Sequence, residues 1–377
     1  MKVTRRFALT LTVLVLAGSA AELVAQDPLL EQDPVVLRFV ERSIAWYPNS
    51  TFRIESDERQ QTPSGSYRTV TVARDCDSKL LTGKPSVLID EMTGLAYLGS
   101  VGQLPTQPPG ANPRALRPFL EGFLPEALQQ NLNMKVRVSW DPPEGAVSGA
   151  IMPFSLTVDT GYGVFAKPAA VTSDGKLLVM AAGVPLDGDP VALRRQLFKD
   201  SDVVIWDHES SGEATVEIVE FSDLECPACK ARWPMIKEVI ESYQDAVRHG
   251  MVSFPLTSIH PWAFRASSAS WCVAEQVPEK LIDFKELFYD LQRDMGVSLV
   301  TPTSVDFVAG HGLDETAFRA CYLRDVSLQA VHEQLALGHR AMVNATPTYF
   351  VNGWMIQVPQ EEWFSGFITR LLAGEEP

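Results

Sequence analysis

The second half of the chain changes from a β-strand pattern to a helical pattern at one point. An apolar run at 216–221 predicts a strand, and the pattern from Ala231 to Tyr243 predicts a helix. Downstream, a second strand is predicted at 247–256. The remaining predicted elements are helices at 262–276, 280–292, 302–311 and 315–339, strands at 348–351 and 354–358 around an Asn-Gly turn, and a final helix at 359–372.

The first half of the chain repeats its pattern once. Asp-Pro or Asn-Pro pairs at 33–34, 112–113 and 189–190 suit the first turn of a helix. The predicted elements are 35–46, 52–56, 67–72, 87–90 and 96–99, and then 115–128, 136–140, 154–158, 170–172 and 177–180. We therefore predict a duplication at 27–111 and 112–199, each unit a helix on a four-stranded antiparallel sheet. A chance alignment of two α+β segments is the alternative.

Composition narrows the classes of partner. The chain has 377 residues, 46% of them hydrophobic and 21% charged, which is ordinary for a globular protein with two or three domains. Its formal net charge is -15 at pH 7. This charge argues against nucleic acid and against electrostatic attachment to anionic lipid.

Residues 1–25 have the pattern of a signal peptide. Lys2, Arg5 and Arg6 precede an apolar stretch at 7–17, and small residues near 18–25 suit cleavage. The stretch is too short to span a bilayer, and no later apolar run reaches that length. The first cysteine is Cys76, so no acceptor for an N-terminal lipid anchor is expected. We predict an exported, periplasmic or extracytoplasmic protein that is soluble after cleavage.

Cys226-Pro227-Ala228-Cys229 lies at the junction of the predicted strand and helix. A thiolate at a helix N-terminus is stabilised by unpaired N–H groups and by the helix dipole, so we expect a lowered pKa for Cys226. Cys226 is then the attacking, partly exposed sulfur. Cys229, one turn further on, can close a disulfide with it and resolve a mixed disulfide with a substrate. The motif predicts redox chemistry.

Half of a zinc site is an alternative for two cysteines at this spacing. Zinc needs two more ligands, and the sequence has no second Cys-x-x-Cys and no nearby histidine pair at ligand spacing. We therefore predict no metal and no cofactor other than the redox-active Cys226–Cys229 disulfide. Cys76 is expected to be a buried or unpaired thiol, with an intermolecular disulfide as the second option.

The order of the C-terminal elements, with Cys-Pro-Ala-Cys at the first strand–helix junction, resembles the thioredoxin fold. A helical insertion at about 257–345 makes it similar to the DsbA-like family of exported thiol oxidoreductases. The motifs that carry the resemblance are 218–229 and 346–353, within a region from Val203 to Leu372. We therefore expect a thioredoxin-like α/β domain at 200–377 with a helical cap, preceded by the two tandem α+β units.

The resemblance implies a cis peptide bond before Pro347, in a loop that lies against the disulfide. Thr346 would offer its backbone to an extended substrate segment, and Pro227 and Ala228 would belong to the same substrate-binding surface. An ordinary trans proline before a strand is the alternative for Pro347.

Glu220, on the strand before the motif, matches the buried acid that the family places beneath its disulfide. On an apolar strand its pKa is expected to rise, and it could then relay the proton that Cys229 loses. Glu217 lies on the same alternating strand, so a solvent-facing carboxylate is the alternative for Glu220.

Ala228 stands where the strongest oxidants of the family have histidine. Without a cation inside the motif the Cys226 thiolate is less stabilised, which predicts a weaker oxidant. His260, after the second strand, is a candidate neighbour of the dithiol, and a histidine that only caps a loop is the alternative.

Cys272 and Cys321 fall on predicted helices of the insertion, beside apolar residues. Some relatives carry a structural disulfide in this insertion, and the resemblance implies that these two cysteines form one. Two separately buried thiols are the alternative.

These features predict an exported thiol:disulfide oxidoreductase that forms, isomerises or reduces disulfides in secreted proteins. Its partners would be cysteine-containing exported proteins and a membrane redox partner that recycles the dithiol. The N-terminal units are similar in topology to dimerisation modules of periplasmic isomerases, which implies a homodimer. A non-enzymatic scaffold protein that binds a partner and has a structural Cys226–Cys229 disulfide is the alternative function.

Overall fold

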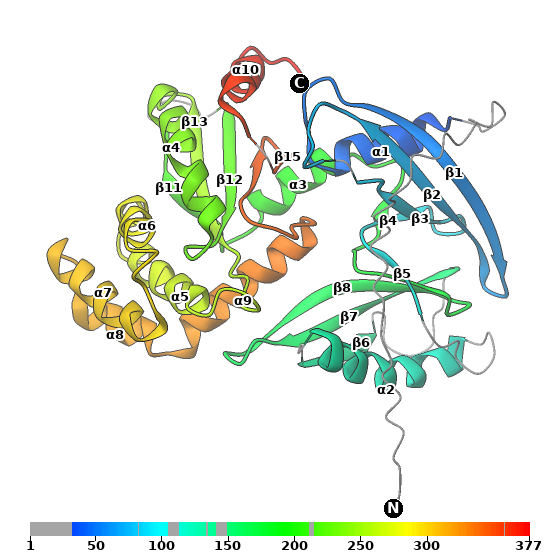
Figure 1. Ribbon diagram of the computed structural model, residues 1–377, viewed down its shortest axis with the longest axis horizontal. Coiled ribbons are helices and arrows are strands. Elements are labelled where there is room, and N and C mark those ends of the chain that lie inside the picture. Colours follow the sequence, from blue (N-terminus) through cyan, green and yellow to red (C-terminus); the bar gives the residue numbers. More distant parts are fainter. Residues whose placement is uncertain are drawn as a thin grey trace, which may run out of the picture.

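The computed structural model describes residues 32–81, 83–104, 113–132, 135–140, 149–210, 215–357 and 359–377. The predicted signal peptide at 1–25 lies outside these residues. Three five-stranded sheets organise the described chain. Two antiparallel sheets belong to the N-terminal half, and a mixed sheet with most of the helices belongs to the C-terminal half (Figure 1).

The first sheet has the strand order β1-β2-β3-β4-β10 and packs against helix α1. Its elements are α1 (Pro34–Ser43), β1 (Thr51–Thr62), β2 (Gly65–Asp75), β3 (Ser86–Asp90), β4 (Leu95–Leu98) and β10 (Val184–Pro185). Asp33 caps α1 as predicted, because its side chain accepts hydrogen bonds from the N–H groups of Val35 and Val36. Val36, Phe39 and Val40 are buried against apolar side chains of the strands.

The second sheet repeats this arrangement with the order β5-β9-β8-β7-β6 and helix α2. Its elements are α2 (Pro113–Leu132), β5 (Val101–Gln103), β6 (Lys135–Trp140), β7 (Ile151–Asp159), β8 (Val164–Thr172) and β9 (Leu177–Val179). Leu116, Leu120 and Leu124 recur every fourth residue and form one buried cluster with Phe154 and Val171. The N-terminal half therefore has two antiparallel sheets with helices, as predicted.

Each N-terminal sheet contains one short strand from the other unit. β5 pairs with β9 of the second sheet, and β10 pairs with β4 of the first. The sheets therefore have five strands each instead of the predicted four, because the exchanged strands cover edges that would otherwise lie open. The sheets also share a core that includes Tyr67, Tyr97 and Ile151, and the side chain of Asp90 accepts a hydrogen bond from the Ile151 N–H (2.9 Å).

The C-terminal sheet has the order β11-β13-β12-β14-β15. Its strands are β11 (Ile205–His208), β12 (Val216–Ser222), β13 (Val247–Ser253), β14 (Thr348–Val351) and β15 (Trp354–Ile356). Side chains of β12 point alternately to the two faces of the sheet. Ile218 lies on one face, in a core with α4 (Pro227–Ser242) and α10 (Glu361–Leu372). Phe221 lies on the other face, in a core with α3 (Pro190–Lys199) and α9 (Asp325–Arg340). The edge strand β11 was not among the strands predicted from the sequence.

Helices α5 to α9 form the inserted cap between β13 and β14. The other four are α5 (Ala263–Ala274), α6 (Lys280–Asp290), α7 (Val297–Gly310) and α8 (Glu315–Tyr322). The single helix predicted at 315–339 is two helices, because Arg324 is extended and separates α8 from α9. Cys272 of α5 and Cys321 of α8 form a disulfide, so this implied pairing is confirmed. No described helix is long and apolar enough to cross a membrane.

The first sheet is attached to the C-terminal sheet through buried backbone contacts. Arg194 of α3 is 3% exposed and donates hydrogen bonds to the carbonyl groups of Ser43 and Gly353. The Trp46 N–H donates to the carbonyl of Met355 in edge strand β15 (2.7 Å). These bonds join the end of α1 to the β14–β15 hairpin.

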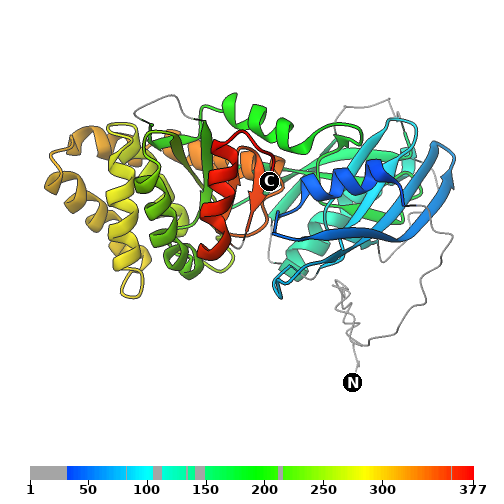
Figure 2. The same cartoon turned by 90° about the horizontal axis from the view of Figure 1, so that it is seen from above.

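The second sheet reaches the cap through the β7–β8 hairpin. Tyr162 at the hairpin tip stacks on Phe264 of α5, with ring centres 4.7 Å apart, and Thr160 contacts His332 of α9 (2.9 Å). Figure 2 shows the two halves of the molecule side by side along its long axis. Both N-terminal sheets therefore pack on the C-terminal half.

Candidate active site

Cys226 is the N-cap residue of α4, immediately after the turn that ends β12. Asp223 organises this turn: its side chain accepts a hydrogen bond from the Glu225 N–H (2.8 Å), and its carbonyl accepts one from the Cys226 N–H (3.0 Å). Pro227 suits the first helical position because it has no N–H to leave unpaired. The predicted strand–helix junction is confirmed, with both cysteines at the helix N-terminus.

The two sulfur atoms differ in acidity. The Cys229 thiol lowers the pKa of Cys226 to about 6; burial opposes this effect, and the N–H groups of Ala228 and Cys229 support it. Cys229 is fully buried, and burial raises its pKa well above the ordinary range, with Cys226 and Glu220 adding to the rise. At neutral pH Cys226 is thus the thiolate and Cys229 the thiol, which is the division that an attacking and a resolving sulfur require.

Cys226 is less accessible than expected. The residue is only 5% exposed, although Pro227 and Ala228 beside it are exposed. The carbonyl oxygen of Thr346 lies 3.4 Å from its Sγ, and Gln292 donates a hydrogen bond to its carbonyl (3.1 Å). The expectation of a partly exposed sulfur is therefore wrong, because the loop before β14 covers it.

The loop before β14 has the implied conformation. The Thr346–Pro347 peptide bond is cis, and both residues are buried next to the dithiol. Pro227 and Ala228 flank Cys226 on the side of α4. The structure therefore brings the four residues of the predicted substrate-binding and cis-proline sites around one sulfur atom.

Glu220 is fully buried on β12, as the resemblance implied. Its Oε2 accepts a hydrogen bond from Lys285 Nζ (2.6 Å) and lies 3.3 Å from His249 Nε2. Burial raises the pKa of Glu220, but Lys285 and His249 outweigh it and lower the pKa to about 2. The expected rise is therefore wrong, because the sequence did not reveal these two partners. So acidic a group is a weak base, and the proton relay expected of Glu220 loses its basis.

Three residues behind the dithiol escaped the sequence interpretation: Asp207 of β11, His249 of β13 and Lys285 of α6. Their side chains are all 0% exposed. His249 Nδ1 lies 2.5 Å from Asp207 Oδ1, and Lys285 Nζ lies 3.6 Å from the centre of the Trp233 ring. Of these three residues, only Lys285 could have been noticed in the sequence, because it interrupts the apolar helix face formed by Leu281, Phe284 and Phe288.

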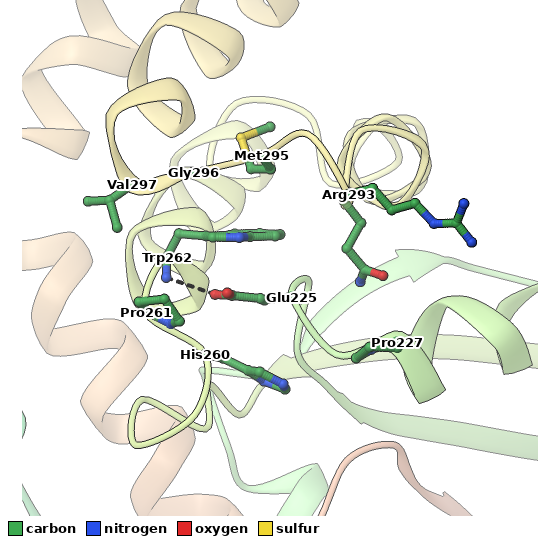
Figure 3. A pocket seen from close by; sticks show the side chains of 10 residues that line it. Glu225, Pro227, His260, Pro261, Trp262, Arg293, Met295, Gly296 and Val297 are labelled. Atoms are coloured by element: carbon green, nitrogen blue, oxygen red, sulfur yellow. Dashed lines mark hydrogen bonds between the residues drawn. The ribbon is translucent and has the colours of Figure 1, made fainter.

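A cavity of about 410 Å³ lies beside the turn that carries Cys226. The Glu225 carboxylate accepts a hydrogen bond from the Trp262 N–H at the start of α5 (2.7 Å), and the Trp262 ring lies between Glu225 and Met295 (Figure 3). The lining also includes Pro227, His260, Pro261, Gln292, Arg293, Gly296 and Val297. This mixed apolar and polar recess adjoins the exposed start of α4.

His260 is both a neighbour of the dithiol and a histidine that holds a loop, so both interpretations from the sequence apply. Its Nδ1 lies 2.7 Å from Asp223 Oδ2, so it fixes the loop after β13 to the turn before Cys226. The hydrogen bond with Asp223 raises the pKa of His260 against the effect of burial, and the negative charge of Cys226 adds to the rise. A protonated His260 therefore places a positive charge near the thiolate from outside the Cys-x-x-Cys motif.

Cys76 lies outside this site. It follows β2 in the first sheet, is half-buried and unpaired, and its Sγ is 4.0 Å from the carbonyl groups of Ser78 and Leu81. The unpaired thiol agrees with the first expectation for this residue.

Comparison with known proteins matches a family model to the C-terminal half of the chain. The thioredoxin family model matches residues 211–370. Disulfide bond formation protein D of Bacillus subtilis is 27% identical over 150 residues, which is 38% of this chain and 67% of that protein. The Na(+)/H(+) antiporter NhaA 3 of Salinispora tropica is 30% identical over 141 residues, which is 37% of this chain and 21% of the antiporter. The match thus spans about a fifth of the antiporter's length.

Solved structures align with slightly less than half of the chain. Wolbachia pipientis alpha-DsbA1 aligns with a TM-score of 0.41 and 15% identity, covering 48% of this chain and 96% of that one. Oxidised BdbD from Bacillus subtilis aligns with a TM-score of 0.40 and 23% identity, covering 45% and 94%. On the matched family, the mixed sheet and the cap, residues 211–370 form a DsbA-like thioredoxin domain of the thiol–disulfide oxidoreductase type, with Cys226 and Cys229 as its Cys-x-x-Cys pair.

Proposed function

We propose that this protein is an exported thiol:disulfide oxidoreductase that exchanges disulfides with cysteine-containing secreted proteins. The observation that carries the proposal is the dithiol itself: Cys226 caps α4 with a lowered pKa, and Cys229 lies buried beneath it. The Cys226 thiolate attacks a substrate disulfide, breaks its S–S bond, forms a mixed disulfide and releases the first substrate sulfur as a thiolate. Cys229 then gives up its proton and attacks Cys226 Sγ in the mixed disulfide, which forms the Cys226–Cys229 bond and releases the second substrate sulfur; the released thiolates take up protons as thiols.

The scaffold alternative, with a structural Cys226–Cys229 disulfide, rests on the low exposure of Cys226. Burial in apolar surroundings raises the pKa of a structural thiol and leaves it inert. Cys226 differs, because the helix N-terminus and the Cys229 thiol lower its pKa to about 6 despite its burial. The acidity of Cys226 favours catalysis over the structural role.

The proposed substrate contacts surround Cys226. An extended substrate segment would pair with the backbone of Thr346, beside Pro347, while Pro227 and Ala228 contact it from the start of α4. Ala228 adds no charge to the motif, whereas the hydrogen bond with Asp223 raises the pKa of His260 in the loop after β13 and so favours a positive charge outside the motif. We therefore expect a dithiol of intermediate potential, weaker as an oxidant than one with a cation inside the motif.

The proposal includes a membrane redox partner that recycles the dithiol, since each turnover leaves Cys226 and Cys229 in the opposite redox state. The name of the Bacillus subtilis relative, disulfide bond formation protein D, agrees with action on disulfides.

We also propose a homodimer through the N-terminal units. Light scattering on the mature chain tests this: twice the monomer mass is expected, and monomer mass at all concentrations contradicts it.

The reduction potential of the purified protein tests the central proposal. We expect equilibrium with glutathione, and a potential more reducing than about -300 mV would refute catalysis. Expression of Cys229→Ala should trap mixed disulfides with exported proteins on a non-reducing gel, because the resolving sulfur is absent. Cys226→Ala is the matched control, and it should trap none because the attacking thiolate is lost.

A further inference from the structure

Four buried ionisable side chains form a continuous network behind Cys229. Lys285 donates to Glu220 Oε2 (2.6 Å), His249 Nε2 lies 3.3 Å from the same oxygen, and His249 Nδ1 lies 2.5 Å from Asp207 Oδ1. All four side chains are 0% exposed. The chain therefore holds two carboxylates out of water, and their negative charges need compensation within the network.

The negative charges of Asp207 and Glu220 are fully compensated within the network only if His249 is protonated. Each ring nitrogen of His249 faces a carboxylate oxygen, so a proton on both nitrogens satisfies both contacts. With Lys285 and His249 positive and Asp207 and Glu220 negative, the four charges sum to zero. A neutral His249 would leave one uncompensated negative charge. In agreement, Asp207 and Glu220 outweigh burial, which lowers the pKa of His249, and raise it to about 9.

The network acts on the dithiol through Glu220 and shared neighbours. Glu220 raises the pKa of Cys229 in addition to burial, and Tyr349 lies opposite Glu220 in the β12–β14 register. Tyr289 of α6 also faces both Glu220 and Cys229. Burial raises the pKa values of both tyrosines well above the ordinary range, so they add no charge at neutral pH. The Trp233 ring also packs near His249, with ring centres 5.9 Å apart.

We propose that Asp207 and His249 are positioning residues for the dithiol: the proton that Asp207 holds on His249 keeps the buried network neutral, and this neutrality favours the reduced, thiolate form of the Cys226/Cys229 pair. The inference rests on the proposed function. Reduction of the disulfide takes up two electrons and one proton, which stays on Cys229, and leaves a negative charge on Cys226, whereas the disulfide has none. A net negative network would therefore disfavour reduction.

A pair of variants separates this charge effect from damage to packing. His249→Gln keeps a polar side chain but removes the positive charge, so the network carries a net negative charge. We expect its equilibrium constant for reduction by glutathione to fall about tenfold and the pKa of Cys226 to rise. Asp207→Asn combined with His249→Gln restores neutrality through Lys285 and Glu220, and should return the constant to within about twofold of the wild type.

His339→Gln is the matched control. His339 is a histidine on the opposite side of the sheet, where it packs against Phe165 and Phe254, and its replacement should leave the constant unchanged. The proposal is overturned if His249→Gln has the wild-type equilibrium constant for reduction. It is also overturned if the constant of the double variant differs from the wild-type value as much as that of His249→Gln does. The ratio of variant to wild type remains measurable even if the wild-type potential refutes catalysis, so the two proposals fail separately.

A measurement on the wild-type protein covers the case in which His249→Gln does not fold. The proposal expects the imidazole NMR signals of His249 to show a doubly protonated ring at pH 7 in both redox states, with loss of the proton only above about pH 8. A neutral ring at pH 7 overturns the proposal.

Discussion

Cys226 and His249 respond to pH in opposite directions, and Cys226 titrates only in the reduced protein. Asp207 and Glu220, against the effect of burial, raise the folded pKa of His249 from 6.5 to about 9, so its contribution to stability is complete below pH 6.5 and disappears as the pH rises through 9. The Cys229 thiol lowers the folded pKa of Cys226 from 9.0 to about 6, so its contribution is complete above pH 9 and disappears as the pH falls through 6.

The two redox states should therefore differ in their pH dependence of stability. Between pH 6.5 and 9 the free energy of unfolding of the oxidised protein should fall, because His249 loses its proton there and Cys226, bonded to Cys229, does not titrate. In the reduced protein the gain from Cys226 should offset that loss. Urea unfolding at both pH values, with and without reductant, measures the difference. Parallel declines in the two states would contradict this assignment.

Lys285 should be among the most sensitive single positions of the core. Lys285→Met keeps the length of the side chain but leaves Glu220 with His249 alone, and we expect a loss of about 3–5 kcal/mol in the free energy of unfolding. Lys280→Met is the control, because Lys280 pairs with Asp283 on the surface (2.7 Å) and is 38% exposed. It should cost under about 1 kcal/mol. Equal losses in urea unfolding would argue against a special role for the buried pair.

The roles of single residues could be predicted from the sequence where the pattern that identifies them spans only a few neighbouring positions. The Cys-Pro-Ala-Cys motif and the Asp33 cap depend on neighbours within a few positions, and both are as expected. The partners of Glu220 are not local: Lys285 lies 65 positions away and His249 lies 29 positions away. No periodicity encodes such pairs, so the direction of the Glu220 pKa shift required the folded chain.

Elements were predictable where their pattern was long enough. β5 has three residues and β10 has two, and each pairs with a strand of the other unit, so neither periodicity nor the repeat could reveal them. The break between α8 and α9 was missed for another reason. Arg324 carries no glycine or proline signal, and only its extended backbone, with ψ 159°, ends the helix.

The disulfide between α5 and α8 should stabilise the cap as an element. Its cysteines are 49 positions apart, so the bond restricts a long loop in the unfolded chain. We expect Cys272→Ala/Cys321→Ala to lose about 2–4 kcal/mol in the free energy of unfolding. The glutathione equilibrium of Cys226 and Cys229 should stay unchanged, which serves as the internal control. A shift in that equilibrium would mean that the disulfide also shapes the active site.

At the scale of the whole molecule, Gly163 decides how closely the second sheet packs on the cap. It has φ +144°, and a Cβ at this position would lie 2.6 Å from His332 Cε1. Gly163→Ala should therefore push the β7–β8 hairpin from α9 and speed hydrogen exchange in α9 several-fold.

Gly161→Ala is the matched control for this contact. Gly161 also has a positive φ, +81°, but a Cβ there would meet no atom within 4 Å. Gly161→Ala should strain only the backbone of the hairpin, and the rate of hydrogen exchange in α9 should stay at the wild-type value. Equal exchange rates in the two variants would show that the hairpin does not hold the helix.

The exchange of β5 and β10 sets an order of events during synthesis. β10 lies after every strand of the second sheet in the chain, yet it closes the edge of β4 in the first. A ribosome that has made all of β1 to β4 has therefore not yet made the strand that completes their sheet. The nascent first sheet keeps an open edge, to which another chain could add a strand, until the second sheet has been translated. The two units are thus finished together, in one folding event that waits for β10 at residues 184–185.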